Sequence, residues 1–141
     1  MISQTAEYAL RAVVFLADQS EPKTNTQIAA AIQIPSGYLA KVMHILSRAK
    51  LVRAQRGLRG GFTLPFAPEN LTVLRVINAI EPIRRIHECP LGMHGKSLCP
   101  LHKSLDDAAK AVEETFGDTT IADLIRVPRH MKPLCRVPES P

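Results

Sequence analysis

The sequence contains no tryptophan, and all aromatic residues together make up only 4% of its 141 residues. Hydrophobic residues still reach 45%, so the core must form from aliphatic side chains, as packed helices allow. No run approaches the roughly 20 apolar residues that a membrane-spanning helix needs. The three cysteines form no even, closely spaced disulfide framework. We therefore expect a cytoplasmic protein whose cysteines are thiols or metal ligands.

Acidic residues are scarce in the first half of the chain. Residues 1–66 contain eight Lys or Arg against three Asp or Glu, whereas residues 67–141 contain ten of each kind. A polyanion would therefore be attracted to the N-terminal half alone. Charge by itself is equally compatible with a generally basic surface, so local pattern has to identify the partner.

Apolar spacing predicts two helices at the start of the chain. Apolar residues recur at three- and four-residue steps over residues 2–19, which is typical of an amphipathic helix. A short Ala-rich helix is expected at about 26–33, with Thr24, Asn25 and Thr26 as candidate N-caps.

A tight turn and a third helix follow. Pro35 disfavours helical geometry at the residue before it, which ends the second helix, and Ser36 is expected to cap the next one. From residue 38 to 49 the apolar side chains share one helical face. Two helices joined by so short a turn predict a helix-turn-helix.

A short hairpin is predicted next. Residues 51–55 and 62–64 alternate apolar and polar side chains, and the glycines between them permit positive φ at the tip. Arg56 and Arg59 lie in this tip, so the hairpin has the form of a wing. The expected fold is mainly α, a winged helix-turn-helix with a two-stranded wing, and residues 1–66 form the expected DNA-binding domain.

The remaining residues are expected to pair subunits and sense a signal. Residues 67–126 are predicted to contain a helix at about 70–81, a Cys- and His-bearing loop at about 86–101, a longer helix ending before Gly117, and a turn at 121–125. The apolar stripe of the longer helix is expected to pack on another subunit and on the first helix. Residues 127–141, with four prolines after residue 127, predict a disordered tail.

The start of the third helix provides the first candidate DNA contacts. In a helix-turn-helix the second helix of the pair enters the major groove, with its N-terminal residues at base edges. Ser36 and Gly37 lie where backbone N–H groups favour a phosphate. Lys41 can reach guanine acceptors. Tyr38 can contact a phosphate or a base, or else be an aromatic residue at the edge of the core.

The wing provides the second set of contacts. Arg56 and Arg59 flank a Gly-rich tip that can enter a minor groove, where guanidinium groups meet concentrated negative potential. A solvated hairpin with incidental arginines is the alternative. The order of helix pair and basic hairpin, together with the charge asymmetry, favours duplex DNA as the partner.

The segments AEYALRAVVFLA and IPSGYLAKVMHILSRAKLVRAQRGLRGGFTL resemble the Rrf-two family of bacterial winged-helix transcription regulators. The resemblance starts at Ser3 and continues through LTVLRVINAIE to about Leu124. It implies a homodimer on a palindromic operator, long helices crossing between subunits, and a sensory loop that biases DNA affinity. A repressor is the expected kind of regulator.

The loop contains two Cys-Pro-Leu units, at Cys89 and Cys99, each with a histidine nearby. Soft ligands of this kind suit zinc or an iron–sulfur cluster. The two thiols could instead form a disulfide, or the loop could be inert. Cluster-binding relatives usually carry three cysteines here, and this sequence lacks the central one, with His94 in that stretch.

A [2Fe–2S] cluster is the cofactor that the resemblance suggests, and it needs four ligands. The candidates are Cys89, Cys99, His94, His102 and Glu7. Glu7 is included because it matches a first-helix carboxylate that some relatives place near the partner subunit's cluster. It could instead be a first-turn acid favoured by the helix dipole, and His102 could simply begin the long helix. Cys135, in the tail, is expected to take no part.

Two other functions compete with that of a DNA-binding regulator. An RNA-binding or protein-docking winged helix would not need two arginines on a glycine tip. A metalloenzyme using Cys89, Cys99 and His102 would lack a general base paired with a nucleophile, and no phosphate-binding Gly loop precedes a helix. The sequence therefore predicts a regulator and no enzyme activity.

Overall fold

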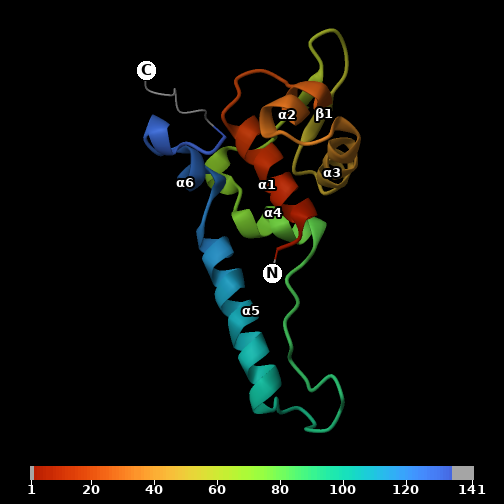
Figure 1. Ribbon diagram of the computed structural model, residues 1–141, viewed down its shortest axis with the longest axis vertical. Coiled ribbons are helices and arrows are strands. Elements are labelled where there is room, and N and C mark those ends of the chain that lie inside the picture. Colours follow the sequence, from red (N-terminus) through yellow and green to blue (C-terminus); the bar gives the residue numbers. More distant parts are fainter. Residues whose placement is uncertain (1, 135–141) are drawn as a thin grey trace.

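The computed structural model describes residues 2–134, and the fold is mainly α-helical (Figure 1). The elements are α1 (Gln4–Ala17), α2 (Asn25–Ile32), α3 (Ser36–Arg48), β1 (Arg53–Gln55), β2 (Gly61–Thr63), the 3₁₀ helix η1 (Pro68–Asn70), α4 (Val73–Ile80), α5 (Pro100–Asp118), α6 (Ile121–Ile125) and the 3₁₀ helix η2 (Arg129–Met131). Within the described residues, no helix is both long and apolar enough to cross a membrane. The predicted order of helices and hairpin is confirmed.

Side-chain caps start the first two helices, as expected for short helices that need their end N–H groups paired. Ser3 Oγ accepts from the backbone N–H of Ala6, and Thr24 caps α2 in a capping box with Gln27. The prediction that Ser36 caps α3 is wrong. Pro35 occupies the cap position without a side-chain bond, because the chain turns one residue earlier than predicted and Ser36 is already helical.

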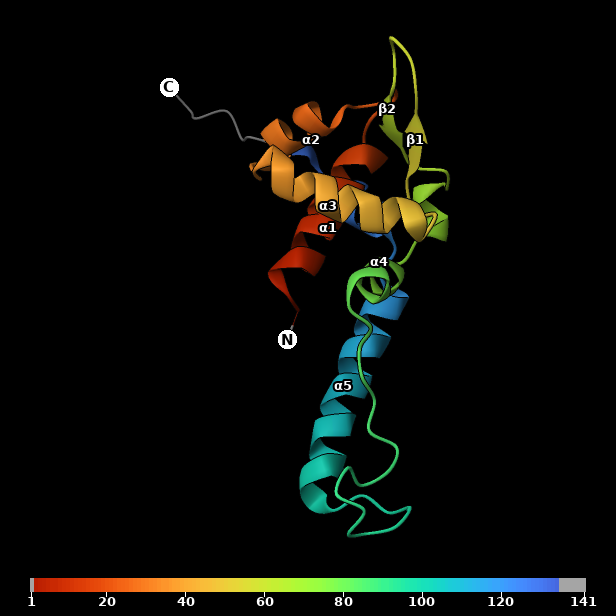
Figure 2. The same cartoon turned by 90° about the vertical axis from the view of Figure 1, so that its right-hand side faces the viewer.

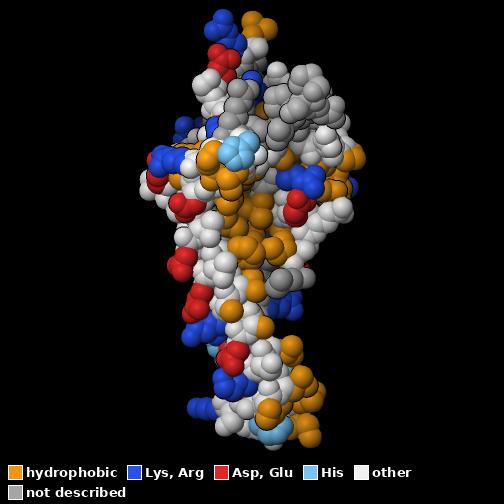
Figure 3. Space-filling view, turned by 60° about the vertical axis from the view of Figure 1, so that its left-hand side comes forward, with side chains coloured by type: hydrophobic (Ala, Val, Ile, Leu, Met, Phe, Trp, Pro, Cys, Tyr) orange, Lys and Arg blue, Asp and Glu red, His pale blue; other side chains and the backbone are white. Residues whose placement is uncertain are grey.

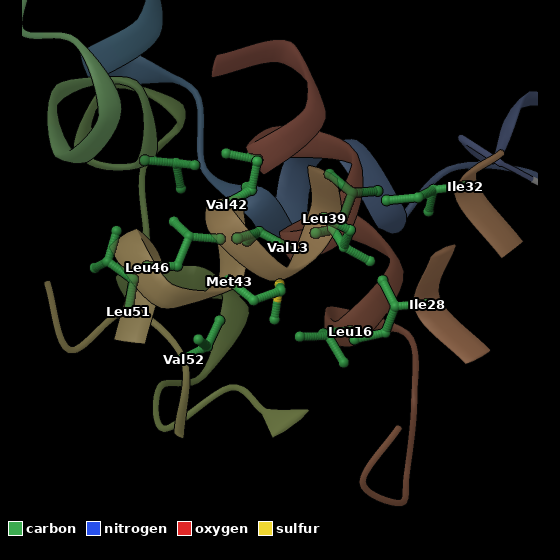
Figure 4. Packing of buried hydrophobic residues seen from close by; sticks show 14 of the residues in the cluster. Val13, Leu16, Ile28, Ile32, Leu39, Val42, Met43, Leu46, Leu51 and Val52 are labelled. Carbon is green, nitrogen blue, oxygen red and sulfur yellow. The ribbon is translucent and has the colours of Figure 1, made fainter. Parts of the chain in front are cut away.

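The core surrounds α1, which contacts α2, α3, α4 and α6. Its buried side chains are aliphatic, including Val13, Ile28, Leu39, Met43 and Leu46 (Figure 4). Replacing a fully buried leucine such as Leu39 with Ala costs about 2–5 kcal/mol in typical cores. Residues of α4 and α6 belong to the same cluster, so the core continues across the predicted boundary at residue 66.

The hairpin pairs Arg53 with Thr63 and Gln55 with Gly61, in antiparallel register. An additional bridge joins Lys23 to Phe62, with backbone N–H groups donating in both directions at 3.1 and 2.7 Å. A Cβ at Gly61 would lie 2.5 Å from the Lys23 carbonyl, and its φ is +145°. Only glycine allows the α1–α2 connection to approach the wing so closely.

The segment from residue 81 through α5 extends away from the core. An extended segment from residue 81 to the loop runs beside α5, which stands away from the core (Figures 1 and 2). In one chain α5 packs on α4 and has no buried residue, and Leu101 and Leu105 are 64% and 51% exposed. The expected end before Gly117 is wrong, because α5 continues to Asp118.

The segment after α6 is partly described. Residues 129–131 form η2, and Lys132 Nζ lies 2.9 Å from Asp18 Oδ1, so residues up to 134 differ from the disordered tail predicted over 127–141. Residues 135–141, with Cys135, lie outside the described residues.

Candidate nucleic-acid interface and cysteine loop

The helix α3 separates a buried face from an exposed one. Leu39, Val42, Met43 and Leu46 are buried. The exposed predicted contacts are Ser36, Gly37, Tyr38 and Lys41, and His44 and Arg48 are exposed as well. His44 and Arg48 were not among the predicted contacts, although their positions three and seven residues after Lys41 indicate the same face.

Tyr38 is tied to α1. Its hydroxyl lies 2.6 Å from Thr5 Oγ1, and its ring meets Tyr8 edge-on with centroids 5.5 Å apart. The side chain is nevertheless 39% exposed. The packing role that the sequence left open for this aromatic residue is therefore present, and it holds the start of α3 against α1.

The start of α3 is also tied to α2. Asn25 Nδ2 donates to the backbone carbonyl of Ser36 at 2.9 Å. Of the three candidate caps, Asn25 is therefore the residue that crosses the turn, while Thr24 caps α2. The two helices are held together where the helix-turn-helix bends.

The wing presents its basic tip away from the body. Arg56, Leu58 and Arg59 are all exposed. In Figure 2, α3 and the hairpin lie on the same side of the fold, with the tip extending beyond α3. One ligand of sufficient length can therefore meet both elements.

Glu7 forms an ion pair within α1. Its Oε1 accepts from Arg11 Nε at 2.7 Å, one helical turn away, and Arg11 also donates to the Ile32 carbonyl at 3.3 Å. Arg11 further lies 5.4 Å above the Tyr8 ring. In this chain the Glu7 carboxylate thus fastens α1 through Arg11 to the end of α2.

Cys89 pairs with the histidine that occupies the central stretch of the loop. Its Sγ lies 3.6 Å from His94 Nδ1, and the residue is 7% exposed. The bond with His94, followed by bonds with the backbone at Leu91 and Met93, lowers the pKa of the Cys89 thiol to about 6. At neutral pH this sulfur is a thiolate, the form that binds metals and reacts with electrophiles.

Cys99 forms a second, separate pair. It precedes α5 as its N-terminal boundary residue, and its Sγ lies 3.3 Å from His102 Nδ1. Between residues 2 and 134, no three His, Cys, Asp or Glu side chains gather as a metal-binding group. One chain therefore supplies two Cys–His pairs and does not by itself fit a four-ligand cluster.

A charge network fastens the segment before the loop to α5. Arg85 donates to both oxygens of Asp106 and to Glu113, and Asp106 also accepts from the backbone N–H of Ile86 at 2.8 Å. Sequence reasoning missed this network, because nothing in the local pattern pairs residues 20 or more positions apart.

An apolar groove of about 350 Å³ lies between the N-terminal end of α1, the end of α4 and the middle of α5. Its lining includes Ile2, Ala6, Ile77, Ala109 and Val112. Figure 3 shows hydrophobic side chains running from the body along α5 toward the loop. The predicted stripe on the long helix is thus left open in a single chain.

Comparison with known proteins identifies a family and several relatives of this chain. The Rrf2 (Rrf-two) family, described as iron-dependent transcriptional regulators, matches residues 2–127. A protein of Aquifex aeolicus named as an HTH-type transcriptional regulator is 32% identical, over 96% of this chain and 99% of its own length. The HTH-type transcriptional regulator NsrR of Geobacillus kaustophilus is 31% identical, over 88% of each chain.

A solved structure shows the same fold. CymR, the global cysteine regulator of B. subtilis, superposes with a TM-score of 0.75 at 26% identity, over 88% of this chain and 95% of its own. The two relatives and the solved structure agree in their described role, and this chain covers most of the length of each. They are transcription regulators and not enzymes. This chain belongs to the Rrf2 family of HTH-type transcriptional regulators.

Proposed function

We propose that this protein is a sequence-specific repressor in the cytoplasm, binding a palindromic DNA operator as a homodimer. The observation that carries the proposal is the exposed face of α3 lying on the same side of the fold as the arginine-tipped wing (Figure 2). Both elements belong to residues 1–66, where the basic excess is concentrated. A duplex offers adjacent grooves and a polyanionic backbone to such a surface.

The proposed contacts of α3 are of two kinds: contacts with phosphates that position the helix on the duplex, and contacts with base edges that read the sequence. The backbone N–H groups at Ser36 and Gly37 begin α3 and are suited to a phosphate. Lys41, one turn further, is suited to the acceptors of guanine in the major groove. The hydrogen bond between Tyr38 and Thr5 holds the start of α3 in place, and the Tyr38 side chain is still exposed enough to contact the phosphate backbone of DNA.

The wing completes the footprint. Arg56 and Arg59 are exposed on a tip whose base is held to the body by the Lys23–Phe62 bridge. Such a tip can reach the minor groove beside the major groove that α3 occupies. The arginines would then add affinity and salt dependence.

We propose a second copy of this chain as the occupant of the groove beside α5. The α5 side of the groove consists of Ala108, Ala109 and Val112, small side chains that allow another helix to approach closely. The polar residues of its lining are Ser3, Glu81 and Arg84. Residues 67–126 would then form the dimerising and sensing part. A two-fold dimer matches a palindromic operator, since each half-site meets one identical reading surface.

We further propose that Cys89 and Cys99 carry the sensing chemistry. Each thiol is paired with a histidine, and Cys99 stands at the N-terminal end of α5. The family description as iron-dependent is consistent with a [2Fe–2S] cluster. Within its described residues, one chain does not present the four ligands of such a cluster, so oxidation of the two thiols is the competing chemistry.

The test of DNA reading uses the full chain and a fluorescence-anisotropy titration. A duplex selected from a random library, or the promoter beside the gene itself, is compared with random duplex DNA. Lys41→Ala should weaken binding to the selected duplex by roughly 5- to 100-fold more than to random DNA. The matched control is Lys110→Ala, which removes the same charge from an exposed position on α5.

The wing arginines should behave differently from Lys41. Arg56→Ala and Arg59→Ala should each weaken binding to all duplexes and reduce the salt slope by about one. Equal losses on every sequence for Lys41→Ala would refute base reading. A chain that prefers RNA, or ignores every duplex, would support the RNA-binding or docking alternative instead.

The sensing proposal is tested on protein purified without oxygen. Visible absorption with stoichiometric iron and sulfide, lost in Cys89→Ala and in Cys99→Ala, would establish a cluster shared between chains. Colourless protein that forms a Cys89–Cys99 disulfide with peroxide, and changes its DNA affinity as it does, would establish thiol chemistry. Variants that leave the DNA response unchanged would exclude both.

A further inference from the structure

The tip of the wing carries a leucine that touches nothing in its own chain. Leu58 is 109% exposed, the highest value among the exposed large hydrophobic residues of the described chain. It lies between Arg56 and Arg59, both exposed. A fully exposed leucine is unfavourable in water, and single exposed leucines occur on many surfaces. Its position between two arginines at the end of a projecting hairpin distinguishes this one.

The backbone holds Leu58 in this position. Gly60 N–H donates to the Gly57 carbonyl at 3.0 Å, which closes the turn around Leu58. A Cβ at Gly60 would lie 2.4 Å from the carbonyl oxygen of Gln55, so the turn is tightly folded. The hairpin below it is anchored by strand pairing and by the Lys23 bridge. The tip therefore presents leucine and arginines together, and the side chain has no pocket of its own chain to enter.

The chemistry of the minor groove matches this combination. The groove of A·T pairs is narrow in runs of A, and its negative potential attracts arginine. Its floor has only the acceptors of A and T, whereas a G·C pair adds the amino group of guanine. A leucine side chain has no acceptor for that amino group. Apolar side chains do enter minor grooves in several classes of DNA-binding protein.

We infer that Leu58 is a specificity-determining contact, which selects A·T base pairs where the wing enters the minor groove. The inference rests on the proposed function, because it requires the wing to meet duplex DNA. Arg56 and Arg59 hold the tip against the backbone, and Leu58 then lies over the floor and sugar walls of the groove. Guanine at that position loses the water bound to its amino group and gains no partner. The operator should therefore have A·T pairs at its flanks, outside the bases that α3 reads.

The test modifies the minor groove alone. The full chain first selects duplexes from a random library, and the strongest duplex is remade with changes at the flanking A·T pairs. Inosine·C keeps the minor groove of A·T and presents the major groove of G·C. Diaminopurine·T keeps the major groove of A·T and adds the amino group of G·C to the minor groove. Affinity for each duplex is measured by anisotropy at one fixed salt concentration.

The wild-type chain should bind the inosine duplex as it binds the parent, and should bind the diaminopurine duplex about tenfold more weakly. Leu58→Ala should bind both modified duplexes within about twofold of the parent, because the small side chain leaves room for a hydrated amino group. Folding of this variant is not at risk, since Leu58 is fully exposed. Leu91→Ala, at another exposed leucine in the cysteine loop, is the matched control and should discriminate as the wild type does.

The possible outcomes distinguish a failure of the proposed role of Leu58 from a failure of the proposed DNA binding. Selection of no duplex by the full chain would overturn both. Selection of a duplex, followed by equal discrimination in the wild type and Leu58→Ala, would overturn the role of Leu58 and leave DNA binding intact. Loss of affinity on the inosine duplex, with none on the diaminopurine duplex, would show major-groove reading at the flanks and would also overturn it.

Discussion

Arg85 and Asp106 face each other in a two-bonded ion pair, with Nε 2.7 Å from Oδ1 and Nη2 2.8 Å from Oδ2. Ile86 adds a backbone bond to the same carboxylate. The segment leading to Cys89 is thereby fixed against the middle of α5, while Cys99 stands at the beginning of that helix. The Asp106 carboxylate therefore fixes how the cysteine loop approaches α5. The same helix lines the groove that we propose is filled by a second copy of the chain.

Acid should loosen this connection. The Arg85 guanidinium, and then the Ile86 N–H, hold the pKa of the Asp106 carboxyl well below its usual range. A carboxyl with a lowered pKa contributes stability that is complete above its unfolded value of about 3.9 and is lost as pH falls through the folded pKa. The protection factor of the Ile86 amide, which is the intrinsic exchange rate divided by the observed rate at the same pH, should therefore fall below about pH 4 in the wild type. Asp106→Asn should exchange faster at neutral pH and lack this acid step, and an unchanged acid step in the variant would contradict the assignment.

The Cys89 thiol should react as a thiolate near neutrality. Because His94 lowers its pKa to about 6, the rate of alkylation by iodoacetamide should rise with a midpoint near that pH. The measurement uses metal-free protein with Cys99→Ser and Cys135→Ser, so that one thiol reports. His94→Ala should move the midpoint up toward about 8.5, the ordinary value for cysteine. A midpoint already near that value in the parent would show that the pair with His94 does not form in solution.

Two glycines should respond oppositely to alanine. Gly61→Ala should destabilise the fold by roughly 1–3 kcal/mol, because its φ of +145° and the Lys23 carbonyl at 2.5 Å leave no room for a methyl group. Gly37 has open space around it and lies within α3, so Gly37→Ala should stabilise by up to about 1 kcal/mol. Urea titration followed by circular dichroism measures both, and equal effects would show that the wing does not approach Lys23 this closely.

Charge placed in the groove should separate subunits. Ala109 lines the groove beside α5, and Ala111 is exposed on the same helix without lining it. Ala109→Glu should weaken self-association on the order of a hundredfold, since a carboxylate would lose its water on dimerisation. Ala111→Glu should leave association unchanged. Sedimentation equilibrium distinguishes the two, and a wild type that stays monomeric at all concentrations would contradict the dimer proposal directly.

Much of the basic half could be predicted from sequence because its signals are local. Apolar spacing alone places α1 and α3 to within a few residues, and the glycines mark the wing. Predictions that needed one backbone conformation in detail were less accurate. The cap at Ser36 and the end before Gly117 were both wrong, since packing decides where a helix stops to within a turn.

The candidate metal ligands were also predicted from local sequence alone, and the fold arranged them differently. The sequence identified two cysteines and their neighbouring histidines as one group, because they are close along the chain. In the fold they form two separate pairs. Distance along a loop does not determine distance in space, so the number of ligands that meet could not be counted beforehand.

The order of the amino acids, by itself, determined which segments are helical, where the hairpin turns and which half of the chain is basic, because each depends on residues a few positions apart. Only the tertiary structure decided that Lys23 would bridge to Phe62 and that Arg85 would bind Asp106. These contacts join residues about 20 or more positions apart. Such contacts form only when the whole core packs, because the entropy of closing each long loop is offset by contacts elsewhere.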